Sequence, residues 1–154
     1  MKKQEYIELA KSLLETQPNQ IALLSNASAF INDTVDNLNW AGFYLYDGKK
    51  LTVGPFQGKV ACSTIELGKG VCGEAALKKT TLVVDDVLAH DNHIACDANS
   101  RSEVVVPIFI NDKLFGVLDV DSPVKNRFDQ ELVDFFEAFV DLLTKLIDFW
   151  CPLG

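Results

Sequence analysis

Three of the four cysteines in the chain are predicted to occupy non-helical positions, and for one of them, Cys96, thiol chemistry is a better explanation than core packing. Cys96 lies in a long polar segment, residues 87–101, whose neighbouring side chains would not bury a small hydrophobic group. Cys62 lies in a strand-like segment and Cys72 on a glycine-rich turn, so a folded sheet could bring the three thiols together. Neighbouring thiols serve either metal binding or thiol redox chemistry. Cys151, near the C-terminus, is predicted to be an ordinary buried thiol.

The charged neighbours of Cys96 act on its thiol in opposite directions. Positive charge on His93 or Arg101 would stabilise a thiolate, whereas the carboxylate of Asp97 would oppose it, and the sequence leaves the balance open. A zinc set could be drawn from both histidines and these cysteines, but it lacks the paired Cys-x-x-Cys spacing of zinc sites. That set is His90, His93, Cys62, Cys72 and Cys96. We therefore predict no metal site and expect both histidines to be solvated.

Three carboxylates are predicted to meet beside this loop. Asp119 and Asp121 alternate along one strand and point to the same face, and Glu103 lies across from them if their hairpin pairs. The cluster is either a solvated strand end or a site that receives a cation and keeps one carboxyl protonated as a general acid. Trp40 and Tyr44 share one strand face and would either wall this pocket or pack as ordinary core residues.

The elements that must position these residues follow from hydrophobic periodicity. Apolar residues at helical spacing predict helices at 3–17, 19–35, 74–78 and 128–149, with Asn19 capping the second and Asn126 or Asp129 the last. Strands are predicted at 40–46, 51–58, 59–67, 81–86, 102–110 and 113–121, with hairpin turns at Asp47-Gly48 and Asn111-Asp112. Helices gathered at both ends around antiparallel strands predict an α+β fold with helices packed on the sheet.

Composition limits the kind of protein that the chain can be. Its 154 residues, 48% of them apolar, are the size of one domain. A net charge of -8 without a cluster of lysines and arginines argues against nucleic acid as a partner. The N-terminal segment alternates charged and apolar residues, which predicts neither a signal peptide nor a membrane helix. We expect a cytoplasmic protein whose thiols are normally reduced.

The motifs that carry these residues resemble those of one enzyme family. The stretches Trp40-Ala41-Gly42-Phe43-Tyr44, GPFQGKVAC, GKGVCGEA, HIACDANSRSE and GVLDVDSP are similar to those of free methionine-(R)-sulfoxide reductases, which are stand-alone GAF domains. The resemblance extends from about residue 39 to the last helix. It implies one GAF domain over residues 1–154, with an antiparallel sheet of about six strands and helices on both faces. Residues 1–36 would form the N-terminal helices and 128–149 the C-terminal helix.

The resemblance also implies a redox mechanism. Cys96 would attack the sulfoxide sulfur and become a sulfenic acid, Cys62 would be the main resolving cysteine, and Cys72 an additional or alternative one. Glu103, with Asp121 as a second candidate, would supply the protons that let the oxygen leave as water. An outside dithiol, for which we expect thioredoxin, would reduce the resulting disulfide, and no bound cofactor is needed.

The same resemblance assigns the substrate-binding residues. Glu103, Asp119 and Asp121 would match the acidic binding and catalytic residues, and Trp40, with Tyr44 beside it, would contact the substrate methyl group. A free amino acid carries an α-ammonium that a carboxylate can hold, and a loop closing over it would exclude polypeptides.

Two matters stay open at this point. The alternative function is that of a ligand-sensing GAF module that binds a small molecule without catalysis. A homodimer formed through the terminal helices is compatible with the sequence.

Overall fold

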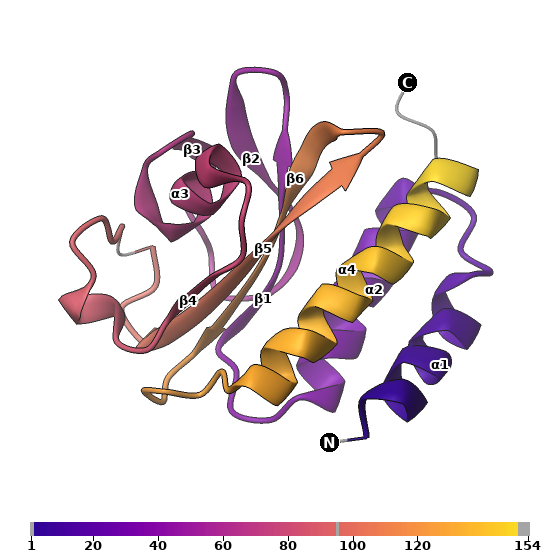
Figure 1. Ribbon diagram of the computed structural model, residues 1–154, viewed down its shortest axis with the longest axis horizontal. Helices are drawn as coiled ribbons and strands as arrows, with labels where there is room; N and C mark the ends of the chain where they lie inside the picture. Colours follow the sequence, from indigo (N-terminus) through magenta and orange to yellow (C-terminus); the bar gives the residue numbers. More distant parts are fainter. Residues whose placement is uncertain (1, 95, 151–154) are drawn as a thin grey trace.

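One antiparallel sheet organises the computed structural model, which describes residues 2–94 and 96–150 (Figure 1). The six strands lie in the order β3-β2-β1-β6-β5-β4, so that the β1–β6 pair is central. Their bounds are β1 Trp40–Tyr46, β2 Lys50–Gly58, β3 Thr64–Glu66, β4 Leu82–Val84, β5 Ser102–Ile110 and β6 Lys113–Ser122. The predicted α+β class and the six-stranded sheet are confirmed.

Helices cover both faces of this sheet (Figure 1). Three lie on one face, namely α1 Lys3–Leu14, α2 Gln20–Thr34 and α4 Gln130–Trp150, and the short α3, Gly70–Lys78, lies on the other. Alternation along β1 supplies both layers, since Phe43 is buried with the three helices and Tyr44 is buried with α3. The chemistry-bearing side chains all belong to the α3 side.

The predicted caps are confirmed at two helix starts. The Asn19 side chain accepts a hydrogen bond from the Ala22 amide at 2.9 Å and caps α2. Asp129 caps α4 in the same way, accepting from the Leu132 amide at 2.9 Å. Asn126, the other candidate for α4, lies in the preceding turn with φ 57°. The first helix ends at Leu14 and not near Gln17, because the chain approaches Pro18.

Both hairpin turns stand where they are predicted. Asn111 and Asp112 have φ of 51° and 64°, the left-handed pair of a tight two-residue turn between β5 and β6. In the other hairpin the Asp47 side chain accepts from the Lys49 and Lys50 amides, each at 2.9 Å. The β5–β6 turn therefore sets the register that brings the acidic residues together.

Two predicted elements differ in the structure. Residues 59–67 contain only the three-residue strand β3, because the chain leaves the sheet after Gly58, whose φ is 143°. Cys62 thus lies in a connecting segment and not in a strand. The short helix begins at Gly70 and not at Glu74, so Cys72 lies in its first turn.

Within the described ranges, no helix combines the length and the apolar character needed to span a bilayer.

Candidate active site

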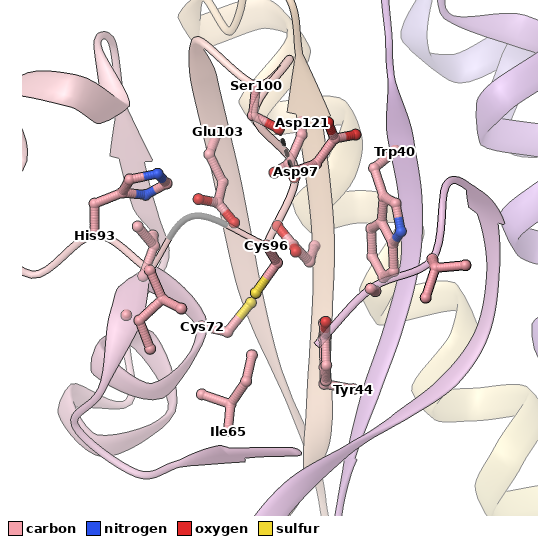
Figure 2. Close-up of a pocket in the computed structure, with 16 residues that line it drawn as sticks. Trp40, Tyr44, Ile65, Cys72, His93, Cys96, Asp97, Ser100, Glu103 and Asp121 are labelled. Carbon is pink, nitrogen blue, oxygen red and sulfur yellow. Dashed lines mark hydrogen bonds between the residues drawn. The ribbon is translucent and has the colours of Figure 1, made fainter. Parts of the chain in front are cut away.

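The three carboxylates meet on the sheet face that α3 covers, and Figure 2 labels two of them, Glu103 and Asp121. Glu103 on β5 pairs with Asp121 on β6, and Asp119 lies one same-face position farther along β6. Their exposed fractions are only 7% for Glu103, 5% for Asp119 and 9% for Asp121. The interpretation as a solvated strand end is therefore wrong, and the alternation in the sequence does place three acids on one patch.

Burial of this cluster changes its acid–base behaviour. Burial is the main cause that raises the pKa of Glu103, followed by the charges of Asp119 and Asp121. The pKa of Asp121 is also raised, first by burial and then by Asp119, against the opposing effect of hydrogen bonds with Glu103 and Ser100. Two of the acids can thus hold a proton at a pH where an exposed carboxyl group has lost it.

Aromatic rings from β1 and β2 form one wall beside the acids. Trp40 pairs with Asp121 across β1 and β6, and its ring stacks on Tyr44 at 5.7 Å and on Phe56 at 4.9 Å. A side chain at Gly42 would overlap Phe56, so the glycine permits this close stacking. The Tyr44 hydroxyl donates to the Cys62 carbonyl at 3.1 Å, which connects the wall to the cysteine segment.

Two of the cysteines are joined. Cys62, between β2 and β3, forms a disulfide with Cys96 of the long loop, with 5.4 Å between their Cα atoms. Both residues are half-buried, and Cys96 lines the same pocket as Glu103 and Asp121 (Figure 2). Cys151 lies outside the described residues. The two joined cysteines are the pair expected to act as nucleophile and main resolver.

Cys72 is a free thiol in the lining of the same pocket. It is 4% exposed, and its sulfur lies within 4.8 Å of carboxylate oxygens of Glu103 and Asp119. Burial raises its pKa, and the charges of Asp119 and Glu103 add to the effect. These three ligand atoms could surround a cation. They differ from the zinc set considered above, in which Cys62 and Cys96 are now joined to each other.

The loop that carries Cys96 is held against α3. His90 Nε2 lies 3.0 Å from Glu74 Oε2, and the Asn92 side chain donates to the Gly68 carbonyl at 2.9 Å. His93 lines the pocket, and its pKa is lowered by burial and by His90. The expectation that both histidines are solvated is therefore wrong.

Arg101 forms hydrogen bonds to the backbone of the loop. Its guanidinium donates to the carbonyls of Ala98 at 2.8 Å and Ser100 at 3.0 Å. The loop contains one short 3-10 turn, Val87–Ala89, and is otherwise irregular among the residues that are described.

Sequence reasoning missed Asn39 as a site residue, and it did not predict the hydrogen bonds that Asp97 and Ser100 form. The Asn39 side chain donates to Asp97 Oδ2 and to Ser100 Oγ, each at 2.9 Å, and Ser100 Oγ lies 3.2 Å from Asp121 Oδ2. Asn39 immediately precedes Trp40 and carries no periodic signal. Its network ties the cysteine loop to the acidic strand.

These parts enclose a single pocket of about 510 Å³, including its open mouth. Two carboxylate oxygens in its lining, Asp119 Oδ1 and Asp121 Oδ1, are buried without a hydrogen-bond partner among the described residues. The Asp119 oxygen is suited to an incoming ammonium group, and a neutral carboxyl beside it can donate a proton. The pocket thus combines an unpartnered carboxylate oxygen, acids with a raised pKa, an aromatic wall and a disulfide sulfur.

Comparison with known proteins agrees with this geometry. Residues 18–147 match the family model described as the GAF domain. The free methionine-R-sulfoxide reductase of Escherichia coli (strain K12) is 41% identical over 136 residues, which cover 88% of this chain and 82% of that protein. The enzyme of the same name from Saccharomyces cerevisiae is 44% identical over 143 residues, covering 88% of this chain and 79% of its own length.

A solved structure shows the same likeness in three dimensions. The free methionine-R-sulfoxide reductase from Neisseria meningitidis, determined in complex with its substrate, superimposes with a TM-score of 0.92 at 37% identity. The match covers 96% of this chain and 89% of that one.

Proposed function

The chain belongs to the GAF domain family and, within it, to the free methionine-R-sulfoxide reductases, and on that basis we propose that it reduces free L-methionine-(R)-sulfoxide to L-methionine. One observation carries the proposal: Cys96, paired with Cys62, lines the same pocket as buried carboxyl groups whose pKa is raised. The reaction needs these two features, a nucleophilic sulfur and a neighbouring proton donor.

The reaction begins at Cys96. Its thiolate attacks the electrophilic sulfur of the sulfoxide, and the sulfoxide oxygen is transferred to Cys96 as methionine leaves, which gives a sulfenic acid. The Cys62 thiol then attacks this sulfenic acid, and a disulfide and water are formed. Overall, two thiols lose two electrons and two protons, and the sulfoxide gains them as it becomes methionine and water. The disulfide in the structure is the product of this sequence.

The three acids have two roles, proton donation and binding of the substrate ammonium group. Glu103 and Asp121, whose pKa values are raised by burial, donate protons to the sulfoxide oxygen. Asp119 receives the α-ammonium of the amino acid on Oδ1, which otherwise has no partner within the described ranges. A methionine sulfoxide residue inside a polypeptide lacks that ammonium group, and this lack accounts for selectivity toward the free amino acid.

The aromatic wall selects the substrate side chain. The stacked rings of Trp40 and Tyr44 on β1 present an apolar surface to the S-methyl group, while the acids on the neighbouring strands β6 and β5 attract the oxygen. Placing the methyl group beside the rings and the oxygen beside the acids orients the sulfur for one epimer, and we assign this to the R form.

An outside reductant completes the cycle. Cys72, the remaining thiol of the described chain, is buried and has a raised pKa, so we assign resolution to Cys62 and recycling to thioredoxin. The proposed enzyme needs no prosthetic group and acts in the cytoplasm, where thioredoxin keeps thiols reduced. We also propose that residues 1–154 form one such domain.

A coupled assay tests the function directly. NADPH consumption is followed with thioredoxin and thioredoxin reductase, with the R and S epimers of free methionine sulfoxide supplied separately. We expect turnover of the R epimer alone, and none with Cys96→Ser. If neither epimer turns over and dithiothreitol in place of thioredoxin also fails, the reductase proposal is refuted. Stoichiometric binding without turnover would then support a ligand-sensing module.

A further inference from the structure

A chain of hydrogen bonds links Asn39, at the start of β1, through Ser100 in the pocket lining to Asp121. Asn39 Nδ2 lies 2.9 Å from Ser100 Oγ, which lies 3.2 Å from Asp121 Oδ2. We propose that Asn39 and Ser100 are positioning residues, which fix the Asp121 proton on Oδ1, facing the substrate. This inference rests on the proposed function, because it explains how one of the assigned acids presents its proton.

The direction of the chain follows from the donors and acceptors available. Asn39 Nδ2 also lies 2.9 Å from Asp97 Oδ2, a carboxylate oxygen that needs a donor, so the nitrogen and not the oxygen of the amide faces this network. Ser100 Oγ accepts from this nitrogen. Its single proton is therefore directed toward Asp121 Oδ2, and each hydrogen bond polarises the next.

The consequence concerns which oxygen of Asp121 is protonated. Because Oδ2 accepts from Ser100, a neutral Asp121 carries its proton on Oδ1. That oxygen is buried and has no protein partner in the described part of the chain, while Asp121 itself lines the pocket. A sulfoxide oxygen that enters the pocket is an acceptor for this proton, in competition with the neighbouring carboxylate of Asp119.

The same asparagine also positions the nucleophile. Asp97 follows Cys96 directly, so its hydrogen bond to Asn39 ties the loop beside the sulfur to the start of β1. The Asn39 amide donates to the Asp121 carbonyl at 3.0 Å, which fixes Asn39 to the strand that carries the acid. Through its side chain and its backbone, Asn39 therefore fixes the position of the Cys96 loop relative to the strand that carries Asp121.

Ser100 acts within a crowded group of ionisable residues. The pocket that Asp121 lines also contains carboxylates from β5, β6 and the loop, a thiol from α3, a phenol from β1 and an imidazole of the loop; these are Glu103, Asp119, Asp97, Cys72, Tyr44 and His93. The Ser100 hydrogen bond lowers the pKa of Asp121, against the rise caused by burial and Asp119. Removing the Ser100 hydroxyl group should therefore raise the pKa of Asp121 further.

The test compares three serine variants in the coupled assay. With Ser100→Ala we expect kcat to fall about 10- to 100-fold with little change in KM, and the alkaline limb of the kcat profile to move to higher pH. Ser100→Thr, which keeps the hydroxyl group, should restore both. The matched control is Ser102→Ala, because Ser102 is equally buried but donates to the Val124 carbonyl at 2.6 Å, away from the acids.

The outcomes separate a positioning role from a structural one. Both alanine variants should lose thermal stability, but only Ser100→Ala should move the pH limb. Wild-type kcat and an unmoved limb in Ser100→Ala would overturn the relay. If the wild-type protein itself does not reduce the sulfoxide, the proposed function fails separately. A carboxyl 13C titration of Asp121 then decides the relay: an upward shift in Ser100→Ala supports it, and an unchanged midpoint overturns it.

Discussion

Exchange of Glu103 for glutamine should raise the free energy of unfolding near neutral pH and lower the rate of turnover. Glu103 is 7% exposed and lies opposite Asp121, with Asp119 nearby, so ionising its carboxyl group costs folding free energy. Because its pKa is higher in the folded chain than the value of about 4.3 in the unfolded chain, its contribution favours folding fully below about pH 4 and is lost as the pH rises. Glutamine has nearly the same shape and no charge, so Glu103→Gln removes this pH-dependent loss.

The stability difference between wild type and Glu103→Gln should therefore grow as the pH rises. Near pH 4 the two proteins should be almost equally stable, whereas at pH 8 the variant should be more stable by about 0.5 to 2 kcal/mol. For a chain of this size the gain corresponds to a rise in Tm of roughly 1 to 8 °C. Turnover of free methionine-R-sulfoxide should fall about 100- to 10,000-fold, because a general acid has been removed.

Urea denaturation of the disulfide form from pH 4 to pH 8 measures the stability difference. Glu66→Gln is the matched control, since Glu66 is exposed on β3 and its exchange alters no buried charge. A difference between wild type and Glu103→Gln that stays constant across this range would refute the reasoning from burial. Full activity of Glu103→Gln would refute its assignment as a proton donor.

The remaining predictions concern the cysteines. Cys62→Ser should release one equivalent of methionine and then stop, leaving a Cys96 sulfenic acid that dimedone labels; repeated turnover with thioredoxin would contradict the role of Cys62. Cys72→Ser should still form the Cys62–Cys96 disulfide after a single turnover, because the Cys72 thiol is buried and its pKa is raised; failure to form it would make Cys72 a resolving cysteine. Reducing the disulfide, which joins residues 34 apart in sequence, should lower the free energy of unfolding by about 3 to 4 kcal/mol. Equal melting temperatures of the oxidised and reduced protein would show that the reduced chain gains compensating contacts.

The acid cluster was predictable because it depends on local geometry. Alternation along β6 places Asp119 and Asp121 on one face, and the two-residue turn fixes the register that brings Glu103 opposite Asp121. The pattern could not show that the cluster is buried. Burial results from α3 and the cysteine loop packing over the sheet, and a strand pattern contains no information about these segments.

The hydrogen bonds to Asn39 illustrate what periodicity cannot reveal. Its two side-chain hydrogen bonds join residues 58 and 61 positions away, and neither depends on a repeating pattern. Residues 59–63 likewise have strand-like composition, yet they lie beyond the sheet because the chain turns away after Gly58. Cys62 is placed opposite Cys96 by that departure from the sheet, so the disulfide follows from tertiary structure and not from the local sequence.

The Cys62–Cys96 disulfide also constrains the order in which reactants bind. The sulfur of Cys96 is either bonded to Cys62 or free to attack a sulfoxide, and it cannot do both at once. Methionine must therefore depart before the reductant acts, and the reductant must finish before the next sulfoxide is attacked. Double-reciprocal plots at several thioredoxin concentrations should be parallel lines, the kinetic pattern of a ping-pong enzyme with two alternating stable forms.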